Sequence, residues 1–137
     1  MLFTQVDHIG LAVRDLDEAV ELYRSSFAIT DWERIELPER HMIAAVARVG
    51  TTLIELIAPT SEAAAFAKFL NERGPGIHHI AYRVDDIVAA LAELKMRGVR
   101  LIDETPRPGL HATLVAFLHP RSTFGTLVEL VEHRSDT

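Results

Sequence analysis

Two stretches of this chain decide its fold because they repeat one another: VDHIGLAVRDLDEAV (residues 6–20) and IHHIAYRVDDIVAAL (residues 77–91). They align without a gap, and each has the pattern of a strand, an acidic helix cap and a helix. Each is followed by a second matching stretch, TLIELI (residues 52–57) and TLVELV (residues 126–131), with a glutamate at the same place. The pattern indicates two copies of one structural unit.

The helix of each repeat is expected to lie on a sheet through an apolar stripe. Asp15 followed by Glu18 resembles a capping box at the start of the first helix. The second helix is capped by Asp85 or Asp86 and ends at Gly98. The apolar residues at helical spacing are Leu16, Ala19, Val20, Tyr23 and Phe27 in the first helix, and Ile87, Ala90, Leu91 and Leu94 in the second.

The spacing of apolar residues also predicts the other elements and the domain organisation. Expected strands cover 4–13, 41–49, 51–58, 77–84, 99–103, 112–119 and 125–132, and a short helix covers 61–73. The hinge at Gly74-Pro75-Gly76 is too short to separate two domains, and each half alone is near the lower size limit for a stable core. We therefore expect one domain over 1–137, with repeat one at about 4–59, a connecting helix at about 61–73 and repeat two at about 76–133.

Composition excludes several classes of function. The 137 residues carry a net charge of −6, which argues against nucleic acid as a partner because phosphate binding draws on Lys and Arg. The chain has no cysteine, so disulfides and thiolate metal ligands are excluded. The first ten residues do not resemble a signal peptide, and no stretch is apolar enough for a membrane span. We expect a cytoplasmic protein with no membrane partner.

Four polar residues on the expected strands form a candidate metal site. Strand alternation places His8 on the face opposite Ile9, Leu11 and Val13, which suit the side beneath the helix, and places His79 likewise. Glu55 and Glu129 share a face with aliphatic side chains, where an unpaired carboxylate costs several kcal/mol. Two imidazoles and two carboxylates suit one divalent ion, and Co²⁺, Mn²⁺, Fe²⁺, Ni²⁺ and Zn²⁺ all remain open.

The remaining histidines carry weaker arguments. A single histidine on a strand is more often structural than a metal ligand, and only the recurrence in both repeats favours His8 and His79. His78 has the wrong strand parity, His119 lies in a turn and His133 lies in a polar tail, so surface or supporting roles suffice for them. His41 and His111 lie beside strand starts, where they either line a pocket or are solvated.

Four motifs resemble the methylmalonyl-CoA epimerase family of the vicinal-oxygen-chelate superfamily: GIHHIAYRVDDI (residues 76–87), RLIDE (100–104), FLHPRS (117–122) and LVEL (127–130). The resemblance implies an α+β fold of the glyoxalase/bleomycin-resistance type, in which two fused βαβββ repeats form a curved sheet around a metal site. It also implies a homodimer. His8, His79 and Glu129 fall on the family's ligand positions, and Glu55 falls where some members carry Gln.

The implied reaction is epimerisation at C2 of methylmalonyl-CoA through a metal-stabilised enediolate, by removal and return of one proton. Glu129 and Glu55 are candidate proton-transfer groups. A glutamate that some members carry as a proposed base falls at about Ala44, so the partner base is unassigned, and the turn from Pro106 to Ala112 is altered. Glu39, His41 and His111 are candidate replacements.

An acyl-CoA substrate also needs local positive or hydrogen-bonding groups in an acidic protein. The candidate substrate-binding residues are Arg107, His111, Arg121 and His41, whereas Lys95 and Arg97 fit ordinary solvated surface.

Three other functions compete with this interpretation. A glyoxalase I-like isomerase would act on a related thioester or hemithioacetal, but the turn at 119–122 favours the epimerase. An extradiol-type dioxygenase would use two His and one carboxylate, and the fourth candidate ligand argues against it. A metal-free small-molecule-binding protein of the same fold would have little reason for four ligands.

Overall fold

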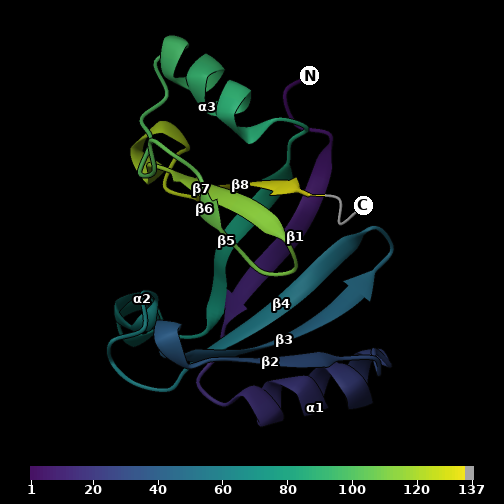
Figure 1. Ribbon diagram of the computed structural model, residues 1–137. Coiled ribbons are helices and arrows are strands. Elements are labelled where there is room, and N and C mark those ends of the chain that lie inside the picture. Colours follow the sequence, from purple (N-terminus) through teal and green to yellow (C-terminus); the bar gives the residue numbers. More distant parts are fainter. Residues whose placement is uncertain (135–137) are drawn as a thin grey trace. The chain divides into compact units, whose positions relative to one another are not determined.

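The computed structural model describes residues 1–134, which form two compact units (Figure 1). The N-terminal unit holds residues 8–78, and the C-terminal unit combines residues 1–7 with the chain from residue 79 onward. In chain order the elements are β1 (Gln5–Ala12), α1 (Leu16–Phe27), β2 (Glu33–Leu37), η1 (Pro38–Arg40), β3 (Met42–Val49), β4 (Thr52–Pro59), α2 (Ala67–Arg73), β5 (Gly76–Arg83), α3 (Ile87–Met96), β6 (Arg107–Pro108), β7 (Thr113–Leu118), η2 (Pro120–Ser122) and β8 (Leu127–His133).

The N-terminal unit is a sheet with helices on its two faces. Its strands lie in the order β2-β3-β4-β1; β3 is antiparallel to β2 and β4, and β4 is parallel to β1. On one face Leu16 and other apolar residues of α1 pack against Ala45 and Leu56. On the other face α2 contributes Leu70 to a cluster with Ile57. Both faces of β4 are therefore partly closed by apolar side chains.

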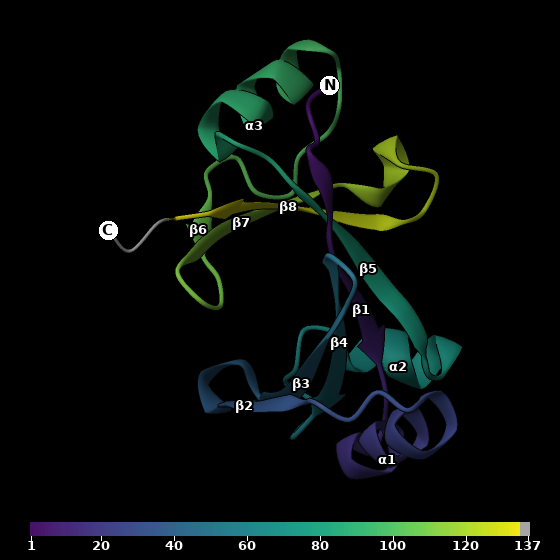
Figure 2. The same cartoon turned by 90° about the vertical axis from the view of Figure 1, so that its right-hand side faces the viewer.

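The C-terminal unit repeats this architecture with strand order β5-β8-β7-β6. Strand β8 runs parallel to β5 and antiparallel to β7. Figures 1 and 2 show α3 along one side of β7 and β8, where Ile87 and Leu91 are buried with Leu130. The start of the chain joins this core, because Phe3 stacks on Tyr82 with ring centroids 4.5 Å apart.

The two units share the same strand register, as the sequence repeat predicts. In the N-terminal unit His8 lies opposite Leu53 and Gly10 lies opposite Glu55. In the C-terminal unit the corresponding pairs are His79 with Leu127 and Ala81 with Glu129. Residues paired in register point to the same face of a sheet. Each histidine therefore shares a face with the glutamate of its own unit.

Both long helices begin at the predicted caps. The Asp15 carboxylate accepts the N–H of Glu18 at 3.0 Å, and Asp86 accepts the N–H of Ala89 at the same distance. Of the two candidate caps in the second repeat, Asp86 is thus the one used. Gly98, with φ of 88°, follows the end of α3 as expected. No helix within residues 1–134 is long and apolar enough to cross a membrane.

The sequence predictions were wrong at several boundaries. Residues 99–103 do not form a strand: Leu101 makes a single bridge to Leu118, and the N–H groups of Ile102 and Asp103 share the carbonyl of Phe117. That sharing bends the backbone instead of extending it. The two-residue strand β6 pairs with β7 instead. The sequence prediction also missed strand β2. Helix α2 begins at Ala67, six residues later than predicted.

Candidate metal-binding and active-site residues

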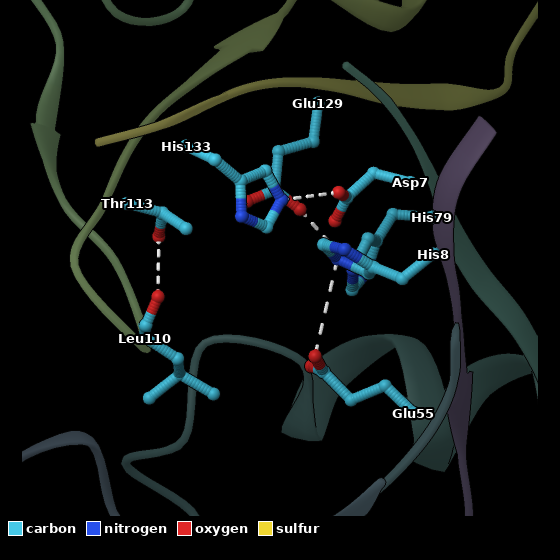
Figure 3. A network of polar contacts seen from close by, with 8 residues as sticks. All are labelled: Asp7, His8, Glu55, His79, Leu110, Thr113, Glu129 and His133. Atoms are coloured by element: carbon cyan, nitrogen blue, oxygen red, sulfur yellow. Dashed lines mark hydrogen bonds and ion pairs between the residues drawn. The ribbon is translucent and has the colours of Figure 1, made fainter. Parts of the chain in front are cut away.

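The C-terminal unit holds a buried pair formed by His79 and Glu129 (Figure 3). The pair arises because β5 and β8 are parallel neighbours and both residues point away from α3. His79 Nε2 lies 3.3 Å from Glu129 Oε1, and the residues are only 5% and 6% exposed. The rings of His79 and Phe117 lie nearly perpendicular to one another, with centroids 6.0 Å apart. An apolar wall thus holds the imidazole in place.

The N-terminal unit holds the equivalent pair, His8 and Glu55 (Figure 3). Their Nε2 and Oε2 atoms lie 3.9 Å apart, and both side chains are largely buried. Leu11 and Val13 pack with α1, which leaves His8 on the opposite face. The predicted separation of faces on β1 is therefore confirmed.

The donor set of each pair suits a divalent cation. Two ligands bound at about 2.0–2.2 Å and roughly 90–109° apart lie about 3.0–3.5 Å from one another. The 3.3 Å between His79 and Glu129 fits that spacing. The 3.9 Å between His8 and Glu55 is wider and would close by ~0.5 Å on binding. Imidazole nitrogen and carboxylate oxygen are ligands that first-row divalent metals accept.

Ala44 occupies the place where a family base was expected. It lies on β3 opposite Ile57, is fully buried and belongs to the apolar cluster beneath α2. The side chain cannot accept a proton, and its surroundings offer a carboxylate no compensation for lost hydration. Position 44 therefore supplies no proton-transfer group in this chain.

Arg107 stands out among the candidate substrate-binding residues because neighbouring side chains hold its guanidinium. Its Nη2 lies 3.5 Å from Asp103 Oδ2, and its Cζ lies 5.7 Å from the centroid of the Phe117 ring. Neither Asp103 nor Phe117 was identified from the sequence as a partner of Arg107. Two sequence features could have indicated these partners: Asp103 precedes Arg107 by four residues, and Phe117 has the same strand parity as Val115.

The other candidates lie on the surface. His41 and His111 are exposed and have left-handed backbones, with φ of 56° and 54°. Arg121 and Glu39 are exposed in the short helices η2 and η1. On and beside α3, Arg97 pairs with Glu93 and Lys95 with Glu104, as expected of solvated surface.

Three further histidines have defined structural settings. The sequence predicted that His133 lies in a polar tail, but it is the last residue of β8. Its Nε2 lies 2.5 Å from Oδ1 of the buried Asp7 (Figure 3). His78 packs against Phe66 and Phe69, and burial lowers the pKa of its imidazole. His119 lies in the predicted turn and accepts the N–H of Arg121 through Nδ1.

Comparisons with known proteins agree with this geometry. The family model "Glyoxalase/Bleomycin resistance protein/Dioxygenase superfamily" matches residues 7–117. The mitochondrial methylmalonyl-CoA epimerase of Dictyostelium discoideum is 36% identical over 93% of this chain and 78% of that protein. The chain belongs to the methylmalonyl-CoA epimerase family.

Two more members extend the likeness. The ethylmalonyl-CoA/methylmalonyl-CoA epimerase of Cereibacter sphaeroides is 37% identical over 92% of this chain and 96% of its own length. A solved methylmalonyl-CoA epimerase in complex with methylmalonyl-CoA and NH4+ superimposes with a TM-score of 0.90 at 34% identity, covering 97% of this chain and 96% of that one. The expected α+β fold is confirmed, and the chain is an isomerase of the epimerase type.

Proposed function

We propose that this protein is a metal-dependent epimerase that interconverts the C2 epimers of methylmalonyl-CoA. The observation that carries the proposal is the buried His–Glu pair found in the same register in each unit. Support for the substrate comes from family members named for methylmalonyl-CoA, one of them solved with that thioester bound.

The proposed ligands of one divalent ion are His8, Glu55, His79 and Glu129. A single pair supplies two protein donors, whereas protein metal sites of this kind usually take three or four. The duplicated halves together supply four. Bound there, Co²⁺, Mn²⁺, Ni²⁺, Fe²⁺ or Zn²⁺ would supply Lewis acidity against the negative charge that develops on the thioester oxygen.

Inversion at C2 requires one group to remove the proton and another to return a proton from the opposite face. Glu129 and Glu55 are the proposed candidates, because each is a carboxylate in a largely buried setting beside a histidine. Ala44 supplies no base. The partner group therefore has to be found by substitution.

The test is to incubate the metal-loaded protein with methylmalonyl-CoA in deuterated water. NMR follows exchange of the C2 proton, and a stereospecific assay follows the change of configuration. We expect exchange with inversion, both abolished by a chelator. Bound metal without exchange would reject this substrate and favour a glyoxalase-like relative, and a protein that binds no metal would favour the metal-free binding function.

Two further parts of the proposal concern the oligomeric state and the cellular location of the protein. We propose a homodimer, to be measured as mass in solution by light scattering; a monomeric mass at working concentration would reject it. We also propose a cytoplasmic location, although the D. discoideum relative is named as mitochondrial. Fractionation of the source cells distinguishes the two compartments.

A further inference from the structure

Arg107 is held on the C-terminal unit by contacts that fix its guanidinium before any ligand arrives. Its partner Asp103 is itself anchored, because Asp103 Oδ2 accepts the N–H of Phe117 at 2.8 Å. The ring of that same Phe117 lies under the guanidinium, 5.7 Å from Cζ. A cation fixed by a carboxylate and an aromatic face loses little side-chain entropy when it binds an anion.

The strand register places Arg107 on the same side of the sheet as the His79–Glu129 pair. Arg107 on β6 lies opposite Val115 on β7, and Val115 lies opposite Val131 on β8. Val131 shares its face with Glu129, two residues earlier on the same strand. Phe117 lies directly opposite Glu129 and also meets the ring of His79. One aromatic side chain thus touches both the guanidinium and the buried imidazole.

The guanidinium keeps binding capacity beyond its known contact. The side chain is 58% exposed, and the ion pair with Asp103 engages Nη2. A guanidinium offers five N–H donors in a planar fork that matches carboxylate and phosphate oxygens. Donors that face solvent beside a buried pair of candidate metal ligands form a receptor for an anion.

We infer that Arg107 binds an anionic group of the acyl-CoA substrate and so sets the specificity of the site; the inference rests on the proposed function. The shared chemistry is a planar cation meeting an oxyanion. Two parts of such a thioester carry oxyanions: the free carboxylate of the acyl group and the phosphates of coenzyme A. The experiment separates these two sources.

The measurement is KM and kcat for Arg107→Gln and Arg107→Lys with two substrates, methylmalonyl-CoA and methylmalonyl-pantetheine, which lacks the nucleotide. Loss of a charge-assisted hydrogen bond of about 1.5–3 kcal/mol raises KM about tenfold or more. A rise with both substrates assigns the acyl carboxylate, and a rise with the CoA ester alone assigns a phosphate. Because lysine lacks the fork, we expect Arg107→Lys to recover only part of the affinity.

Arg97→Gln is the matched control, because Arg97 is also an exposed arginine paired with an acid four residues earlier, but it follows α3. Its KM should not change. Asp103→Asn tests whether the ion pair with Asp103 positions the guanidinium, and it should raise KM less than Arg107→Gln does. An active enzyme whose KM is unchanged by Arg107→Gln with both substrates would overturn the inference.

Calorimetry with methylmalonyl-CoA, alongside circular dichroism of each variant, separates this inference from the proposed function. Wild-type protein that binds the thioester without turning it over would contradict the proposed function, and weaker binding by Arg107→Gln would still support the inference. Equal affinity of the wild type and Arg107→Gln, or no binding by either, would overturn the inference.

Discussion

At the scale of single residues, the proposed metal centre depends on histidines and glutamates that are removed from water. Glu129 is 6% exposed beside His79, and the side chain of Glu55 is 15% exposed beside His8. An ionised carboxylate in such a setting requires hydrogen bonds, an opposite charge or a metal ion. The two glutamates nevertheless differ, because Glu55 falls where some family members carry Gln.

That difference predicts unequal effects of one substitution. Glu55→Gln keeps an oxygen donor, so metal content should remain and activity should fall less than about tenfold. Glu129→Gln likewise replaces a candidate ligand and proton-transfer group, but family members do not suggest that Gln is tolerated at this position, so activity should fall by about a hundredfold or more. Steady-state turnover and metal analysis of both variants measure the contrast. Equal losses would show that the halves do not differ in this way.

The pair of Asp7 and His133 should contribute to stability. Asp7 is buried, and its Oδ1 lies 2.5 Å from His133 Nε2, within hydrogen-bond distance. Asp7→Asn, His133→Gln and the double variant form a cycle, and urea unfolding should give a coupling free energy of about 1–2 kcal/mol. Additive effects of the two single substitutions would mean that the contact does not stabilise the fold.

The sequence predicted some of these residues and not others, for a physical reason. The repeat made the candidate ligands identifiable, because a His and a Glu recur at equivalent positions of both halves: His8 and His79, Glu55 and Glu129. Asp7 and His133 are far apart in the sequence, and their contact depends on how the strands twist. Asp103 and Arg107 lie on either side of a bend, and their contact depends on where the loop turns. Strand parity determines only a side chain's face, not the partner it meets.

At the scale of elements, helix α3 offers a sharp test of its start. Asp86→Ala removes the side chain that accepts the N–H of Ala89 and should lower the free energy of unfolding by about 1 kcal/mol. Asp85→Ala is the control, since this neighbour is exposed and is not the cap, and it should change stability by less than about 0.5 kcal/mol. Denaturant unfolding measures both. Equal losses would reject Asp86 as the cap.

The turn between β6 and β7 requires glycine at position 109. A Cβ atom there would lie 2.5 Å from Thr113 Oγ1 and 2.7 Å from Val115 Cγ1. Thr113 is already engaged, because its hydroxyl donates to the carbonyl of Leu110 (Figure 3). Gly109→Ala should therefore cost roughly 1–3 kcal/mol.

Gly76→Ala is the control for this turn, since a Cβ at Gly76 meets nothing within 4 Å and the residue has an ordinary φ. Thermal unfolding of the two variants measures the difference. A Gly109→Ala protein as stable as Gly76→Ala would show that the turn can relax around the new methyl group.

Long periodic segments were the elements that the sequence predicted well. Helices α1 and α3 begin at predicted acidic caps, and β4 and β8 carry the predicted glutamates. The prediction failed where strand formation depends on hydrogen bonding to a neighbouring strand and not on the spacing of apolar residues. Val99 to Asp103 has apolar residues but forms only one bridge, whereas Arg107 and Pro108 pair despite weak strand propensity.

At the scale of the whole molecule, a duplicated half accounts for both the fold and the candidate site. Each unit has a sheet with a helix packed on it, and the His and Glu positions match in register. The sequence made this duplication visible. The sequence named Arg107 as a candidate substrate-binding residue but could not name its partners, because only the folded chain brings them together.

The most direct test of the proposed metal centre is metal stoichiometry, measured by elemental analysis and native mass spectrometry on wild type, His8→Ala, His79→Ala and the surface control His111→Ala. We predict one divalent ion per chain in wild type and His111→Ala, and loss of that ion from either of the other variants while circular dichroism shows a folded protein. Two ions per chain, or one ion retained in full by both His8→Ala and His79→Ala, would contradict a single centre built from the two halves.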